Sequence, residues 1–148
     1  MISVTYKRYK KTIHQEYIAY LYPDGTEQRI YNNGDKDWYL NNKLHRTDGP
    51  AIEWANGDKR WYLNGELHRV DGPAIEYLSG NKRWFLNGQY HRIDGPACEY
   101  ADGTKYWYLN GELHRTDGPA IKCPDGTKYW YLNGVELTEQ EFLAEINK

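Results

Sequence analysis

The sequence contains no long apolar run, and no segment approaches the roughly 18 apolar residues of a membrane-spanning helix. Its first residues also lack the apolar core of a signal peptide. These absences favour a cytosolic protein without membrane contacts. Neither sign of charge predominates, since the net charge is -2. Binding by neutralisation of phosphates requires a basic face, so we do not expect a nucleic-acid partner.

Cysteine is nearly absent: Cys98 and Cys123 are the two in the chain, and their spacing is not that of a metal site. Each stands where related segments carry isoleucine or tyrosine. The sequence therefore predicts free thiols in an apolar setting.

Basic residues cluster only near the start, at Lys7, Arg8, Lys10 and Lys11. Charges on an edge strand block pairing with other chains. We expect a solvated edge strand there.

Tryptophan recurs every 23 residues within the frame G-x-K-x-W-[YF]-L-N. The five positions are Trp38, Trp61, Trp84, Trp107 and Trp130. A fixed period of this length marks a repeat architecture, in which neighbouring units cover one another's apolar faces. We predict a single domain with a degenerate N-terminal cap at 1–34, repeats at 35–134 and a helical cap at 135–148.

Asn-Gly and Asp-Gly pairs divide each repeat into segments of strand length. The predicted fold is all-β, with stacked antiparallel hairpins or meanders in a solenoid-like sheet. A short C-terminal α-helix would close it. Thr138 and Glu141 predict a capping box, and an apolar stripe follows the cap. The stripe consists of Leu137, Phe142, Leu143 and Ile146.

The register follows if each Asn-Gly pair forms a two-residue loop. Ile75 would then face Trp84, and Glu76 would face Arg83. Around Asn64-Gly65 the same rule sets Tyr62 against Leu67 and gives a three-strand meander. Ile, Trp and His would share one face of a continuous sheet, with Ala, Tyr and Leu on the other and the tryptophans in equivalent buried sites.

The segment WYLNGELHRTDGPAI, followed by PDGTKYWYLNG, resembles repeats of accessory proteins from tailed bacteriophages and some bacteria, related to MORN-type repeats. The resemblance covers the chain from Pro23 onward. It implies stacked β-hairpins that bind proteins or lipids, and a host protein as the partner of a phage protein in the host cytoplasm. DGTKYWYLNGEL is also similar to choline-binding and clostridial toxin repeats, which implies a glycan or choline binder as the alternative.

A His-Arg-x-Asp group recurs in four copies, with its histidines at His45, His68, His91 and His114. Catalysis usually needs one constellation with a distinct nucleophile or metal. The repetition therefore favours a structural ladder: His packs on Trp, Arg donates to carboxylates or carbonyls of the adjacent unit, and Asp opens the turn. We expect no enzymatic activity and no cofactor, and an enzyme with an unrecognised site is the remaining alternative.

Metal binding by the ladder histidines is not expected. Equivalent side chains in such units lie roughly 10–15 Å apart, whereas zinc ligands converge within about 2 Å of the ion.

The aromatic and arginine residues beside the tryptophans are the better candidates for binding a protein partner. They are Arg60, Tyr62, Arg83, Phe85, Tyr106, Tyr108, Tyr129 and Tyr131. A flat sheet offers no enclosed ligand site, which favours an extended protein contact. The alternative is that these rings only cover the sheet. Sheet edges also allow pairing with a second copy of the chain.

Replacing His68 and His91 together by Gln should lower the melting temperature, because both are expected to be structural. Added zinc should leave the melting temperature of the unmodified protein unchanged. A zinc-dependent rise in thermal melts would restore the metal hypothesis, since a ligand of the native state stabilises it.

Overall fold

The computed structural model describes residues 9–148 and divides the chain into two compact units. One ends at Glu66 and the other spans Leu67–Lys148. Nearly all regular structure in the described part is antiparallel strand, and one helix follows the last strand. The all-β fold with a C-terminal helix is confirmed.

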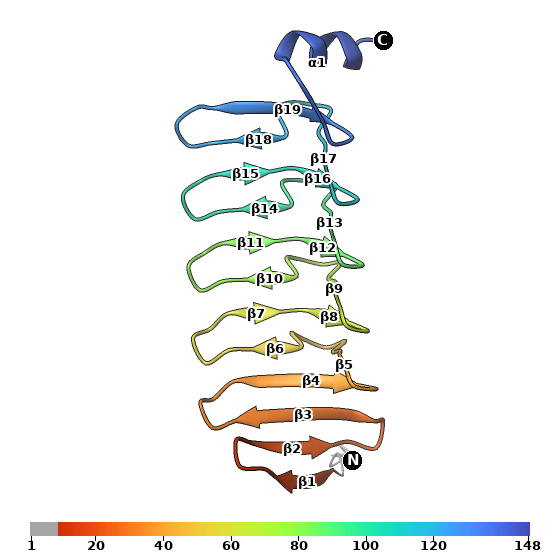
Figure 1. The fold of residues 1–148 in the computed structure, drawn as a ribbon, viewed down its shortest axis with the longest axis vertical. Helices are drawn as coiled ribbons and strands as arrows, with labels where there is room; N and C mark the ends of the chain where they lie inside the picture. The colour runs from red at the N-terminus through yellow and green to blue at the C-terminus, as the bar shows by residue number, and fades with distance from the viewer. Residues whose placement is uncertain (1–8) are drawn as a thin grey trace, which may run out of the picture. The chain divides into compact units, whose positions relative to one another are not determined.

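The first unit is built on an antiparallel sheet in which β1 to β4 lie side by side (Figure 1). Its strands, in spatial order, are β1 (Lys10–Ile13), β2 (Tyr17–Leu21), β3 (Thr26–Tyr31), β4 (Lys36–Leu40), β6 (Ile52–Glu53) and β7 (Lys59–Arg60). β5 (Lys43–Leu44) also pairs with β4. β8 (Tyr62–Leu63) and β9 (Glu66–Leu67) flank the next Asn-Gly turn.

Lys10 and Lys11 lie on β1, the outermost described strand, whose residues are all exposed. The solvated edge strand is thus confirmed for these two lysines. Lys7 and Arg8 lie outside the described residues.

In the second unit, sheet hairpins follow one another and shorter hairpins lie beside them (Figure 1). The sheet strands are β10 (Ile75–Glu76), β11 (Lys82–Arg83), β14 (Cys98–Glu99), β15 (Lys105–Tyr106), β18 (Ile121–Lys122), β19 (Lys128–Leu132) and β20 (Val135–Leu137). The shorter hairpins are β12 (Phe85–Leu86) with β13 (Gln89–Tyr90), and β16 (Tyr108–Leu109) with β17 (Glu112–Leu113).

The predicted register of the sheet hairpins is wrong by one residue. Ile75 faces Arg83 and Glu76 faces Lys82. The reason is visible at the equivalent turn, where Gly57 N–H donates to Trp54 O at 2.9 Å and closes a three-residue loop. Such a loop combines a turn with a glycine in the left-handed region, here at φ 98°.

The other Asn-Gly turns do form the two-residue loop. Phe85 faces Tyr90, and Tyr108 faces Leu113. Both turn residues have positive φ, for example 51° at Asn87 and 75° at Gly88, as the tight hairpin turn requires. The predicted register is confirmed for these two hairpins.

The meander is not continuous in the inner repeats, contrary to the prediction. β4 runs through Trp38 and β19 runs through Trp130. At Trp84 and Trp107, by contrast, one strand ends just before the tryptophan and another begins just after it. The short hairpins after them belong to separate two-stranded sheets. Trp38 is buried and the other repeat tryptophans are half-buried. The predicted burial of Trp61, Trp84 and Trp107 is therefore wrong, since each of these rings remains partly exposed.

The one-residue shift also changes the faces of the sheet. Asp37 lies opposite Ile52, so these side chains share a face. Trp38 follows Asp37 on β4 and projects to the other face. Ile and Trp therefore lie on opposite faces, which corrects the predicted grouping.

The most completely buried residues are small. Ala51, Ala74, Ala97 and Ala120 are 0% exposed. Each follows the proline of an HRxDGP segment, and the Trp84 N–H donates to Ala97 O at 2.8 Å. An alanine in every copy thus packs where a larger side chain would have to displace its neighbours.

Helix α1 (Glu139–Ile146) begins with the predicted capping box, in which Thr138 and Glu141 bond reciprocally. The predicted apolar stripe is only partly buried. The Phe142 ring lies 4.7 Å from that of Trp130 and is 1% exposed, but Leu143 is 46% exposed and Ile146 40%. One aromatic contact therefore anchors the helix. A helix of eight residues is short, and here only Phe142, near its middle, is buried against the last strands.

Phe142→Ala should detach α1 and lower the free energy of unfolding by about 3–5 kcal/mol, as expected for a buried aromatic side chain. Leu143→Ala, in the same turn but exposed, should change stability by less than about 0.5 kcal/mol. Urea denaturation followed by tryptophan fluorescence measures both. Equal effects of the two changes would contradict this packing.

Candidate functional site

In three of the HRxDGP segments the arginine guanidinium lies over the ring of the repeat tryptophan. The guanidinium carbon of Arg92 is 4.0 Å from the Trp84 ring centroid, and Arg46 on Trp38 and Arg115 on Trp107 have the same distance. Such cation–π contacts contribute about 0.5–2 kcal/mol. The contact was not foreseen, since histidine was expected on the tryptophan.

Hydrogen bonds fix the guanidinium in this position. Arg92 donates from Nε to Asp94 at 2.9 Å, and from Nη1 to Pro96 O at 3.2 Å and Glu99 at 2.9 Å. The equivalent bonds recur at Arg46 and Arg69. The expected role of arginine as a donor to carboxylates and carbonyls is confirmed, but its side-chain partners lie at most seven residues further along the chain.

Glycine permits this close approach. A Cβ at Gly95 would stand 2.9 Å from the Arg92 guanidinium carbon. The Asp-Gly-Pro turn therefore leaves a space that the arginine fills.

The last copy departs from the others because Lys122 replaces the second carboxylate. Arg115 then donates to both oxygens of Asp117, at 2.7 and 3.3 Å. Lys122 lies directly opposite Lys128, a like-charge pair, whereas Glu99 lies opposite Lys105.

Histidine joins successive repeats. Nδ1 of His91 accepts the backbone N–H of Asn110 at 3.2 Å, and Nδ1 of His45 accepts that of Asn64 at 3.1 Å. The same bond occurs at His68 and His114. Each ring thus holds the tight turn of the following repeat, which gives the histidine ladder a structural role.

Beside each stacked pair the surface is hollowed into what we call a Trp–Arg groove. The grooves beside Trp38, Trp84 and Trp107 have volumes of about 490, 690 and 600 Å³. The second is lined by Trp84, Leu86 and His91 between two HRxDGP loops, and the third by the equivalent residues one repeat later. Arg92, Ile93 and Asp94 form the wall that these two share. The expectation of a flat sheet without concave sites is corrected.

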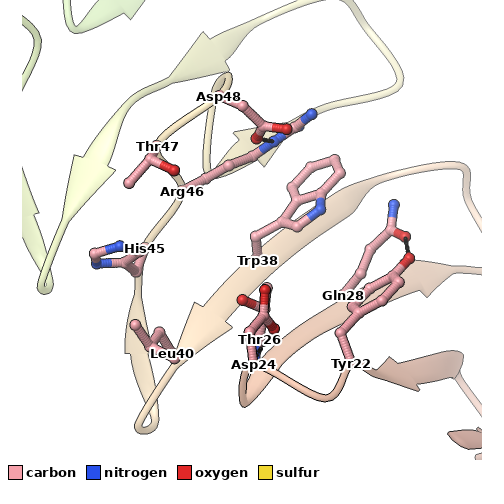
Figure 2. A pocket seen from close by; sticks show the side chains of 10 residues that line it. All are labelled: Tyr22, Asp24, Thr26, Gln28, Trp38, Leu40, His45, Arg46, Thr47 and Asp48. Carbon is pink, nitrogen blue, oxygen red and sulfur yellow. Dashed lines mark hydrogen bonds and ion pairs between the residues drawn. The ribbon is translucent and has the colours of Figure 1, made fainter. Parts of the chain in front are cut away.

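The first groove has a different second wall (Figure 2). Trp38 lies below Arg46 and Asp48, and across the hollow the Tyr22 hydroxyl donates to Gln28 at 3.2 Å. β2–β3 residues thus replace the preceding HRxDGP loop.

Each HRxDGP loop forms a ridge beside a groove, and the exposed tip of the ridge carries negative charge. The Asp94 side chain is 84% exposed while Arg92 is 21% exposed. The hydrogen bond from Arg92 lowers the pKa of Asp94, so the carboxylate stays ionised at neutral pH. Next to it Ile93 is 85% exposed, as Val70 is 82% exposed one repeat earlier.

The residues predicted to bind a partner are mostly half-buried on the opposite face. Phe85 is 8% exposed and Tyr129 is 42% exposed, and the remaining six lie between these extremes. Phe85, Tyr90 and Tyr108 form a packed row with ring centroids 4.1 and 4.9 Å apart. Phe85→Ala would therefore disturb the fold, although the binding assignment of these residues itself remains a prediction.

A buried carboxylate occurs on this face in the first unit. Asp37 is 9% exposed, and it accepts hydrogen bonds from Tyr31 at 2.9 Å and Tyr39 at 3.1 Å. Burial raises the pKa of Asp37, and burial together with that carboxylate raises the pKa of Tyr39 to about 12.

The two cysteines are free thiols in the structure. Cys98 is buried, which raises its pKa to about 11, and Cys123 is half-buried and free. Among residues 9–148, no three His, Cys, Asp or Glu side chains converge as a metal site would require.

The described segment holds no helix of the length and apolarity needed to cross a membrane. No protein-family model matches the sequence, and no curated protein matches it.

Lys122→Glu should stabilise the protein by about 0.5–1 kcal/mol, because it gives Arg115 a second carboxylate and replaces a like-charge pair by an opposite one. Loss of the Lys122 contact above Trp107, at 5.6 Å, offsets part of this gain. Thermal melts measure the effect. Glu99→Lys, the reverse change one repeat earlier, should lower the melting temperature, and a rise there would contradict the proposed network.

Proposed function

We propose that this chain is a non-enzymatic binding protein that uses the Trp–Arg grooves and their ridge tips to contact another protein. The repetition of one groove along the second unit is the observation that carries the proposal. Exposed apolar tips at Val70 and Ile93 border these grooves. Apolar side chains next to tryptophan and arginine are typical of protein interfaces.

The bonding of the polar groups supports binding rather than catalysis. Each HRxDGP arginine is held by its aspartate, and each ladder histidine accepts a backbone N–H through Nδ1. A general base must reach the proton that it abstracts. In these repeats the groups that resemble acid-base pairs are already used to hold turns.

The same geometry disfavours choline as the ligand. A quaternary ammonium binds over the face of an aromatic ring. At Trp84 and Trp107 one face already carries the guanidinium, 4.0 Å from the ring centroid. The structure thus gives the choline alternative no observation in its favour.

The resemblance to phage repeats suggests a host protein as the partner, and inhibition of that protein, for example a defence component, as the consequence. The contact surface in this proposal lies on the tryptophan face. The half-buried stripe that contains Arg83 and Tyr108 contributes to the core of the repeats instead.

Changing Val70 and Ile93 together to Thr should weaken capture of the partner by at least about fivefold, the equivalent of about 1 kcal/mol. The fold should survive, because Thr47 and Thr116 occupy these positions in other repeats. The measurement is a pull-down from bacterial lysate with mass spectrometry, followed by titration of the captured protein.

Val135→Glu is the matched control. Val135 is 59% exposed but lies outside the grooves, and Glu112 is its counterpart one repeat earlier. The control should retain full binding. Equal capture by the groove variant, or retention of the protein solely on choline or cell-wall resin, would contradict the proposed function.

A further inference from the structure

The second and third Trp–Arg grooves lie one repeat apart. Trp84 follows β11 and Trp107 follows β15, and in the sheet β14 lies between these strands. Two strand spacings amount to about 9.4–9.8 Å. A ligand that fills both grooves in the same way must therefore repeat at about this distance.

A polyproline II helix has this period. Its three residues per turn advance about 9.3 Å, so every third side chain points to the same side. An extended β-strand offers same-side residues at about 6.6 or 13 Å, and an α-helix offers them at about 10.5 Å after seven residues. Polyproline II fits the groove spacing best.

The groove floor suits such a ligand chemically. Trp84 and Leu86 line the second groove, and Trp107 and Leu109 the third. Aromatic-lined grooves bind proline-rich segments because the ligand is already ordered before it binds. Ile93, between the grooves and 85% exposed, supplies an apolar contact for the residues that cross the ridge.

Charge defines the ligand further. Each ridge directs an aspartate outward, with side-chain exposure of 78% at Asp71, 84% at Asp94 and 79% at Asp117. The arginines that pair with them are 14–22% exposed. The accessible charge along the ridge tips is therefore negative, which complements a cationic segment.

We propose that the second and third grooves bind a basic, proline-rich segment of the partner in the polyproline II conformation, with every third residue in a groove. This inference rests on the proposed function and names the chemistry of the partner surface. Lysine or arginine side chains of the segment lie against Asp71, Asp94 and Asp117.

Synthetic peptides test the inference by calorimetric titration of the full chain. Four repeats of Pro-Pro-Lys should bind, whereas four repeats of Pro-Pro-Glu should bind at least about tenfold more weakly because their charge opposes the aspartates. Four repeats of Gly-Ser-Lys keep the positive charge without the helix, and should also bind at least about tenfold more weakly.

A peptide with one glycine between its second and third Pro-Pro-Lys repeats tests the period. The extra residue shifts the register by about 3.1 Å and a third of a turn. Affinity should fall, because only one half of the peptide then matches a groove. Equal affinity for the continuous and the interrupted peptide would overturn the proposed spacing.

Two variants at one exposed position test the charge without disturbing the arginine network. Both Ile93→Lys and Ile93→Glu lose the apolar contact, so the comparison between the two variants isolates the charge. Ile93→Lys should bind the Pro-Pro-Lys peptide about two- to fivefold more weakly than Ile93→Glu, the range expected of one exposed charge contact. Val135→Lys adds the same charge away from the grooves and should have no effect. Identical affinities of both Ile93 variants for the Pro-Pro-Lys peptide would contradict the proposed attraction between the basic segment and the aspartates.

The outcomes separate this inference from the broader proposal. If no peptide binds, or if Gly-Ser-Lys repeats bind as well as Pro-Pro-Lys repeats, the polyproline inference is wrong. The proposed function then still stands provided that the Val70/Ile93 variant loses the captured protein. If that variant keeps its partner, the grooves are not the binding surface and both proposals fail.

Discussion

The stacking of an arginine on the repeat tryptophan is the contact on which the local structure depends. The guanidinium of Arg92 covers Trp84, and it binds Asp94, Pro96 O and Glu99 with the same planar group. One side chain thus holds the turn, strand β14 and the indole ring in a fixed relation. Five donors in a rigid plane make this feasible for arginine and not for lysine. The glycine of the turn is required because the guanidinium occupies the space of its Cβ.

Stacking within each unit relies on more than the sheet ladder. The short hairpins of neighbouring repeats are also joined by isolated backbone hydrogen bonds. Examples are those from Arg92 N–H to Tyr108 O at 3.2 Å and from Gly111 N–H to Tyr90 O at 2.9 Å. The Nδ1 atom of each ladder histidine adds a third bond to the following turn. Each repeat therefore presents its loop at a constant offset from the next. This regular offset turns one shallow hollow into a series of grooves with a common spacing.

Much of the architecture is predictable because it follows from local chemistry. The period of the tryptophans indicates the repeat, the glycine turns indicate strands, and Thr138 with Glu141 indicates the helix start. The Trp–Arg grooves are harder to predict from the sequence. Ala97 is 0% exposed, but alanine carries little hydrophobic signal. The stacking of Arg92 on Trp84 joins residues eight apart through a turn whose shape the residue types do not reveal. The single clue was the joint recurrence of Arg, Asp and Gly at fixed offsets.

The two kinds of Asn-Gly turn mark the boundary between what sequence and tertiary structure each decide. At Asn56 the side chain accepts the Asp58 N–H at 2.9 Å, and a three-residue loop forms around Gly57. At Asn64 the backbone N–H instead donates to His45 at 3.1 Å, and both turn residues take positive φ. The sequence by itself determined that the chain turns at both places, because asparagine and glycine tolerate the conformations required. Which residues then share a face depends on the type of turn, and at Asn64 the tight turn is held by the histidine of the preceding repeat, a partner that only the folded chain brings within hydrogen-bonding distance.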